Sequence, residues 1–205
     1  MAATSAAGAS HRSRRCSGGA CILSDGAFTV TRDLLRAELA GDLSRGGYVL
    51  RSDASASVTR RYFDKFLVLS RPGLLTRAAR LLADLVAEDC ERLAVTGVPS
   101  ATLATALAQE TGLTLLLGRE RQAGAFGGEL SAGTRATLVE DVVFSGQTAL
   151  AGARALREAG AEPLEVVALL DRQSGAAQLL ASEGLPLRAL FTEAQLLEQP
   201  GRPPL

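Results

Sequence analysis

Two adjacent carboxylates, Glu140 and Asp141, follow a short apolar stretch and precede a turn that holds Ser145 and Gly146. The apolar stretch predicts a strand, and the residues from Gln147 onward have the spacing of a helix. The amino end of a helix carries unpaired N–H groups and a partial positive charge, which suits a phosphate group. A glycine in the turn lets the backbone approach such a ligand closely. The segment therefore has the residue types of a phosphate site.

The two carboxylates limit what else that site can bind. Negative charges a few ångströms from a phosphate would repel it unless they met hydroxyl groups or a metal ion. Ribose hydroxyls and Mg²⁺ are partners of this kind, and Ser145 and Thr148 can donate hydroxyl hydrogen bonds to the phosphate. The spacing predicts a sugar-phosphate site, although two solvated acids at a strand end would give the same pattern.

Alternating apolar runs and helical patterns surround this segment and would position it. Strands are predicted over 93–96, 113–117, 136–139, 164–170 and 187–191. Helices are predicted over 100–110, over 147–159 and up to Gly184, and Thr192 with Gln195 predicts a capping box on a last helix. Runs that are apolar on both faces, separated by helices, predict an α/β fold with a mainly parallel sheet covered on both sides. Ligands bind beyond the carboxyl ends of such strands, so one edge of the sheet should carry the loops that start at Gly97, Gly118, Glu140 and Asp171.

The amino-terminal part of the sequence has a different rhythm. Thr31 can cap a helix that stops near Gly46. Strands are predicted over 48–50 and 62–69, with a polar loop between them. Ser70 can cap the following helix, which has a proline in its first turn.

Composition excludes several classes of function. The 205 residues carry 22 basic and 22 acidic side chains, so no overall charge favours nucleic acid or a membrane surface, and we expect neither as a partner. No apolar run is long enough to span a bilayer. Three cysteines without metal-ligand spacing and a single histidine argue against a zinc site or a histidine-based triad. A reduced compartment, the cytoplasm, fits these thiols best.

Both ends of the sequence differ from the part between them. Residues 1–26 are rich in alanine, serine, glycine and arginine, and we expect a disordered extension, with a transit peptide as the alternative. Residues 27–198 are expected to form one domain, and the proline-rich residues 199–205 a tail.

Several segments together resemble a known family. Residues 138–148, Leu-Val-Glu-Asp-Val-Val-Phe-Ser-Gly-Gln-Thr, resemble the motif with which type I phosphoribosyltransferases bind 5-phosphoribosyl-1-pyrophosphate (PRPP). Further segments resemble the orotate phosphoribosyltransferases, in the order and spacing of that family: 62–65, 71–75, 97–99, 170–175 and 187–192. The resemblance covers roughly residues 34–197 and implies the type I phosphoribosyltransferase fold, a central sheet flanked by helices with a small amino-terminal hood.

The resemblance also implies roles for individual residues. Glu140 and Asp141 would hold the ribose hydroxyls, with Asp141 also catalytic and in indirect contact with Mg²⁺. The rest of the PRPP-binding loop would be Val142, Val143, Phe144, Ser145, Gly146, Gln147 and Thr148, with the last four cradling the 5-phosphate. Arg119 would be catalytic and would bind PRPP. Orotate would meet Arg172 at its carboxylate, and Arg51 and Phe63 elsewhere. A homodimer that converts orotate and PRPP to orotidine 5-monophosphate and pyrophosphate, with Mg²⁺, is the implied enzyme.

The sequence departs from the family pattern at two places. In the catalytic loop, 118–128, Arg119 matches the family, but Glu120 and Ala123 stand where it has lysines. Near the base, Phe144 stands in place of a threonine and Asp53 in place of a glycine. These departures keep two alternatives open: a phosphoribosyltransferase for another base, and a catalytically impaired protein that senses PRPP or a nucleotide.

Overall fold

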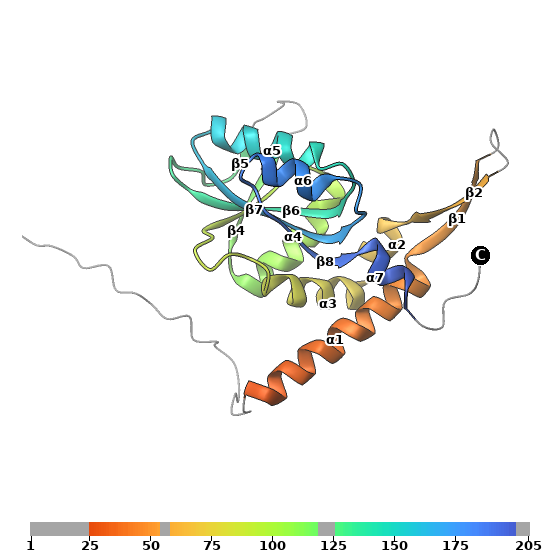
Figure 1. Ribbon diagram of the computed structural model, residues 1–205. Helices are drawn as coiled ribbons and strands as arrows, with labels where there is room; N and C mark the ends of the chain where they lie inside the picture. The colour runs from red at the N-terminus through yellow and green to blue at the C-terminus, as the bar shows by residue number, and fades with distance from the viewer. Residues whose placement is uncertain (1–24, 54–57, 119–125, 200–205) are drawn as a thin grey trace, which may run out of the picture.

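A six-stranded sheet forms the centre of the molecule, in a computed structural model that describes residues 25–53, 58–118 and 126–199 (Figure 1). The strand order is β5-β4-β3-β6-β7-β8, and all neighbours are parallel except β4 and β5. The strands are β3 (Arg92–Val95), β4 (Thr114–Gly118), β5 (Phe126–Gly127), β6 (Arg135–Val143), β7 (Glu162–Asp171) and β8 (Leu187–Thr192). The expected mainly parallel sheet is therefore present.

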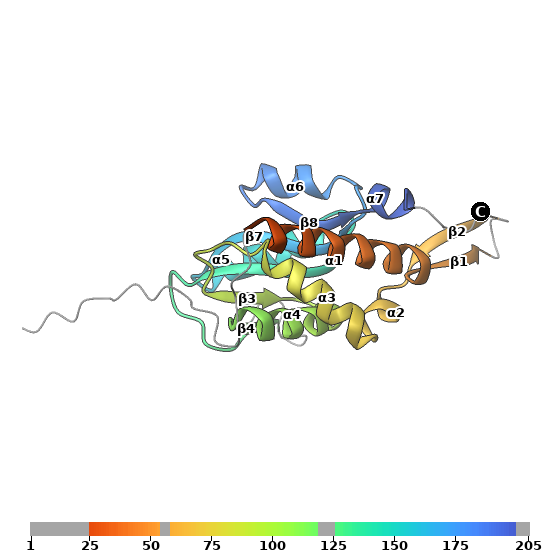
Figure 2. The same ribbon diagram turned by 90° about the horizontal axis from the view of Figure 1, so that it is seen from below.

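Helices cover both faces of this sheet. On one face lie α1 (Asp25–Gly46), α3 (Pro72–Ala83) and α4 (Val98–Thr111), and on the other α5 (Gln147–Glu158) and α6 (Ala176–Ser182) (Figure 1). Figure 2 shows α1 running beside α3 and reaching α7 (Glu193–Leu197), with which it is in contact. No helix in the described ranges has the length and apolar character to cross a membrane.

The alternation of side chains along β6 and β7 divides the core between the two faces. Leu138 and Val166 pack with the helices α5 and α6, whereas Val139 and Val167 pack with α1, α3 and α4. All four side chains are fully buried. Strands buried on both faces explain why these runs are apolar throughout, because successive side chains point to opposite sides.

A small antiparallel hairpin, β1 (Tyr48–Asp53) and β2 (Val58–Phe63), stands apart from the main sheet and corresponds to the expected hood (Figure 1). The expected strand over 62–69 is wrong beyond Phe63, since α2 (Lys65–Leu69) is a helix. The helix begins here because the carboxylate of Asp64 accepts hydrogen bonds from the N–H groups of Phe66 and Leu67 and so caps its amino end. Ser70 was expected to cap the amino end of the next helix, but it is the carboxyl-terminal cap of α2.

The ends of other helices and strands also differ from those predicted from the sequence. Helix α1 begins at Asp25, so Thr31 lies inside it and does not cap it. Strand β6 continues to Val143, which places Glu140 and Asp141 inside the strand and not in the loop after it. Helix α4 is closed by Gly112 in the left-handed conformation, and the predicted capping box of Thr192 and Gln195 is confirmed.

Candidate functional site

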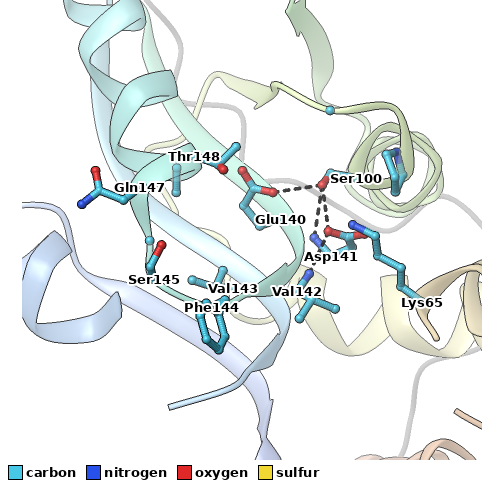
Figure 3. Close-up of a pocket in the computed structure, with 14 residues that line it drawn as sticks. Lys65, Ser100, Glu140, Asp141, Val142, Val143, Phe144, Ser145, Gln147 and Thr148 are labelled. Atoms are coloured by element: carbon cyan, nitrogen blue, oxygen red, sulfur yellow. Dashed lines mark hydrogen bonds and ion pairs between the residues drawn. The ribbon is translucent and has the colours of Figure 1, made fainter. Parts of the chain in front are cut away.

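A cavity of about 200 Å³ lies at the carboxyl edge of the sheet, where β6 runs into α5 (Figure 3). Residues 140–149 form one wall, the first turn of α4 forms another, and Lys65 of α2 closes a side. All of the expected PRPP loop from Glu140 to Thr148 lines this cavity. The structure thus brings together the segment that the sequence singled out and two elements far from it in sequence.

The hydroxyl of Ser100 joins the two carboxylates. Its Oγ lies 3.0 Å from Oε2 of Glu140 and 3.2 Å from Oδ1 of Asp141, and it accepts a hydrogen bond from the N–H of Asp141 at 3.3 Å. A serine hydroxyl has one proton to donate, so it satisfies one carboxylate at a time. Ser100 is 3% exposed, and its place in the first turn of α4 holds it beside Glu140 and Asp141 (Figure 3).

Glu140 is nearly enclosed, and its protonation reflects this. Burial raises the pKa of its carboxyl group to about 7, the Ser100 hydroxyl lowers it and the neighbouring Asp141 raises it. A weaker contact comes from the hydroxyl of Thr96, 3.4 Å from Oε1. Glu140 therefore changes charge near neutral pH.

Lys65, like Ser100, lines the cavity although no role was predicted for it from the sequence. Its ammonium nitrogen lies 2.9 Å from Oδ2 of Asp141, an oxygen that has no aligned hydrogen bond among the described residues. The contact is thus an ion pair without the geometry of a hydrogen bond. Two signals pointed to it: Lys65 is the only lysine in a sequence with 22 basic residues, and it follows Asp64, the cap that turns the chain into α2.

The turn into α5 has the geometry of a phosphate cradle. Gly146 precedes the helix with φ of 79°, a left-handed conformation that favours glycine. A Cβ on Gly146 would lie 3.2 Å from Cα of Ala176, so the turn is also packed against α6. Helix α5 has no side-chain cap, and its first helical hydrogen bond runs from the N–H of Leu150. The three N–H groups before it remain for a ligand.

Beside this turn, Arg172 is held by two side chains. One oxygen of Glu193 lies 3.2 Å from both Nε and Nη2 of its guanidinium. The guanidinium carbon stands 5.6 Å from the centre of the Phe144 ring, and Phe144 is 58% exposed and lines the cavity. The residue expected to recognise the base carboxylate is therefore close to the cavity.

Comparison with known proteins agrees with this geometry. No family model matches the chain. The orotate phosphoribosyltransferase of Halobacterium salinarum is 34% identical over 179 residues, which cover 83% of this chain and 99% of that protein. The chain belongs to the orotate phosphoribosyltransferase family. The enzyme of a Nocardioides species is 37% identical over 176 residues, covering 79% of this chain and 94% of that orotate phosphoribosyltransferase.

Solved structures of the family have the same fold. The orotate phosphoribosyltransferase of Mycobacterium tuberculosis in complex with PRPP superposes with a TM-score of 0.68, at 26% identity, over 79% of this chain and 98% of that chain. The expected type I phosphoribosyltransferase fold, the family and the transferase class are therefore confirmed.

Of three further residues of the expected site, only the side chain of Phe63 is described. Phe63 is 3% exposed and packs in the core, and it does not line the cavity. Arg51 lies on β1, where its backbone pairs with Arg60. Arg119 lies outside the described residues, as do Glu120 and Ala123.

The carboxylates have the donor type that the family's Mg²⁺ would need. Mg²⁺ prefers oxygen ligands and is commonly held by one or two carboxylates together with substrate phosphates. Asp141 has oxygens of this type, but its Oδ2 already faces the ammonium of Lys65, so the expected indirect contact of Asp141 with Mg²⁺ stays a prediction. Within the described ranges there is no group of three His, Cys, Asp or Glu side chains that would hold a metal alone.

Proposed function

We propose that this chain transfers the phosphoribosyl group of PRPP to orotate, giving orotidine 5-monophosphate and pyrophosphate. The observation that carries the proposal is the cavity itself, in which a carboxylate pair and an open helix amino end lie on consecutive residues of one strand-turn-helix unit. A sugar phosphate has hydroxyl groups that can donate hydrogen bonds to the carboxylate pair and an anionic phosphate that suits the helix amino end.

In this proposal Glu140 and Asp141 accept hydrogen bonds from the ribose hydroxyls. Ser145, Gly146, Gln147 and Thr148 surround the 5-phosphate with N–H and hydroxyl donors. Because the carboxylates are held by Ser100 and Lys65, the sugar meets acceptors that are already in place. The anomeric carbon would then be fixed relative to both the base and the pyrophosphate.

The reaction exchanges one bond at the anomeric carbon for another. The bond from that carbon to the pyrophosphate oxygen breaks, its electron pair leaves with pyrophosphate, and a ring nitrogen of orotate forms the new bond. Negative charge grows on the leaving oxygens, and cations stabilise it. Arg119 is proposed for this role, and bound Mg²⁺ would supply further positive charge there.

Arg172 is proposed to bind the carboxylate of orotate, since a planar guanidinium matches a planar carboxylate. Arg51 stays a predicted contact of the base, and Phe63, which packs in the core, is not assigned one here. A homodimer and a cytoplasmic location complete the proposal, and light scattering of the purified chain measures the first.

Turnover of orotate tests this function. Orotate, PRPP and Mg²⁺ are mixed with the full chain, conversion is followed by ultraviolet absorbance, and PRPP binding is measured by calorimetry on the same sample. The proposal expects both turnover and binding. Binding of PRPP without orotate turnover would contradict it and leave the two alternatives.

A base other than orotate is favoured by the exposed ring of Phe144 at the base end of the cavity, where the family pattern has a threonine. Turnover assays with uracil and with purine bases in place of orotate separate this alternative. The PRPP sensor is separated by restoring lysines, Glu120→Lys with Ala123→Lys. A large rise in turnover at unchanged PRPP affinity would show that the catalytic loop limits an otherwise complete site.

A further inference from the structure

Three side chains from three separate elements meet at the base end of the cavity. Phe144 follows β6, Arg172 follows β7, and Glu193 is the first residue of α7. Among the described residues, only Glu193 forms a hydrogen bond or ion pair with the guanidinium of Arg172, and only Phe144 has its ring beneath it.

The way in which Glu193 contacts the guanidinium leaves part of it free. An arginine has five N–H donors, one on Nε and two on each terminal nitrogen. A single oxygen of Glu193 takes the edge formed by Nε and Nη2, at 3.2 Å from each. The opposite edge, formed by Nη1 and the second N–H of Nη2, keeps two parallel donors. That is the arrangement a carboxylate binds through both of its oxygens.

Glu193 is itself held in place from two sides. Thr192 and Gln195 form the capping box that fixes the first turn of α7. The side chain of Gln173 accepts a hydrogen bond from the N–H of Ala194 at 3.1 Å and so ties the residues after β7 to α7. Gln173 adopts φ of 55°, which is unusual for a residue other than glycine, so its conformation is maintained by these contacts.

We propose that Glu193 is a positioning residue for base recognition, which holds Arg172 by the Nε and Nη2 edge so that the other edge binds the carboxylate of the base while Phe144 supports the guanidinium. The inference rests on the proposed function and deepens it, because it explains how this chain recognises a carboxylated base.

Stabilisation of the fold is a weaker explanation for the same contact. The side chains of Arg172 and Glu193 are 27% and 21% exposed, and ion pairs that water reaches contribute little to stability. Orientation is a larger effect, since a free arginine side chain loses much rotational freedom when it forms a two-point contact. A guanidinium already oriented by Glu193 has less freedom left to lose.

The alternative arrangement, in which Glu193 competes with the substrate for Arg172, predicts the opposite result. A competing carboxylate would weaken orotate binding, and its removal would strengthen it. A positioning carboxylate strengthens orotate binding, and an amide in its place would still accept hydrogen bonds from Nε and Nη2. The variants Glu193→Ala and Glu193→Gln therefore separate the two.

The experiment measures orotate affinity by calorimetry on the full chain, with ribose 5-phosphate and Mg²⁺ in the sugar-phosphate site, and KM for orotate and for PRPP in the turnover assay. We expect Glu193→Ala to weaken orotate binding about tenfold with KM for PRPP unchanged, and to lose most of the preference for orotate over uracil. Glu193→Gln should stay close to the wild type. Glu198→Ala, at the other end of α7, is the matched control for effects on the helix, and thermal unfolding is measured for all variants.

Unchanged or stronger orotate binding in Glu193→Ala would overturn the inference, and so would a Glu193→Gln variant as weak as Glu193→Ala. A wild-type chain that binds orotate without turning it over contradicts only the proposed reaction, and the dissociation constants of the variants still decide the role of Glu193. A wild-type chain that binds no orotate overturns both.

Discussion

The ammonium group of Lys65 lies 2.9 Å from the buried carboxylate of Asp141. The two residues come from different parts of the fold: Lys65 begins α2, which follows the hairpin in the sequence, and Asp141 lies near the end of β6 in the central sheet. Asp141 is 2% exposed, so an unpaired charge there would be costly. Lys65 supplies a positive charge beside two adjacent acids, as the proposed binding of the anionic PRPP next to them would require.

Lys65→Met should therefore weaken PRPP binding. The substitution keeps the length of the side chain and removes its charge, so the carboxylates would repel the phosphates of PRPP more strongly. We expect a loss of about tenfold in affinity, or about 1.4 kcal/mol, measured by calorimetry with Mg²⁺. Lys65→Arg, which keeps the charge, is the control, and equal affinity in Lys65→Met and the wild type would contradict the role.

Because the sequence has no other lysine, chemical modification tests the same contact without a substitution. An amine-reactive reagent can modify only Lys65 and the chain amino terminus. PRPP should slow the modification of Lys65 and leave that of the amino terminus unchanged, as peptide mass spectrometry would measure. Equal rates at Lys65 with and without PRPP would show that the ligand does not cover it.

Ser100→Ala is expected to loosen both carboxylates. Among the contacts that lower the pKa of Glu140, this hydroxyl has the largest effect, so its loss should raise that pKa and move the pH dependence of PRPP binding toward higher pH. Binding titrations between about pH 6 and 9 would measure the shift, a range set by the ordinary width of a single titration. Thr105→Ala, an exposed hydroxyl on the same helix, should leave the profile unchanged.

Glu140 also makes stability depend on pH. Its pKa is about 7 in the folded chain, against 4.5 for a free side chain, so between these values the folded chain binds more protons than the unfolded chain. Stability should then fall as the pH rises from 4.5 to about 7. Glu140→Gln removes this dependence and should raise the free energy of unfolding above pH 7 by up to about 3 kcal/mol. Urea unfolding at pH 4.5 should show a much smaller gain, and equal gains at both values would contradict the assignment.

The sequence predicted the sheet and the PRPP loop because both depend on local patterns. An apolar run such as the one before Glu140 predicts a strand that is buried on both faces of the sheet. Gly146 predicts the turn that follows this strand. The contacts of Lys65 and Ser100 with Asp141 could not be predicted from the sequence, because they depend on how α2 and α4 pack on the sheet. The strand expected through 62–69 failed for a local reason, since the capping carboxylate of Asp64 outweighed the β-branched and aromatic residues around it.

Gly146 and Gly175 form a matched pair for testing the phosphate turn. Both precede a helix with positive φ, 79° and 92°, but a Cβ at 146 would press on Ala176 while a Cβ at 175 would meet nothing within 4 Å. Gly175→Ala should cost about 1 kcal/mol from backbone strain alone. Gly146→Ala should cost about 2–3 kcal/mol and weaken PRPP binding as well. Thermal unfolding and calorimetry measure the two effects, and equal costs would show that the packing against α6 does not matter.

At the amino ends of the strands, on the side of the sheet away from the cavity, the buried carboxylate of Glu165 contacts three segments of the chain. It accepts hydrogen bonds from the N–H of Ala87 at 2.6 Å and the hydroxyl of Thr137 at 3.2 Å, and its second oxygen lies 3.0 Å from Nε of Arg188. Arg188 is half exposed and can turn to water when the carboxylate is removed, but the hydroxyl of the fully buried Thr137 cannot.

Glu165→Ala should therefore destabilise the fold without changing the site. A buried donor left without a partner costs about 1–3 kcal/mol, so a loss of about 1–3 kcal/mol is expected in urea unfolding from the hydroxyl of Thr137. Glu162→Ala, an exposed carboxylate on the same strand, should have little effect on stability. The PRPP affinity of Glu165→Ala should match the wild type at temperatures where the variant is folded, because the carboxylate lies at the amino ends of the strands and the cavity at their carboxyl ends. A loss of affinity in the folded variant would mean that the position of β6 at the cavity depends on its anchoring at the far edge of the sheet.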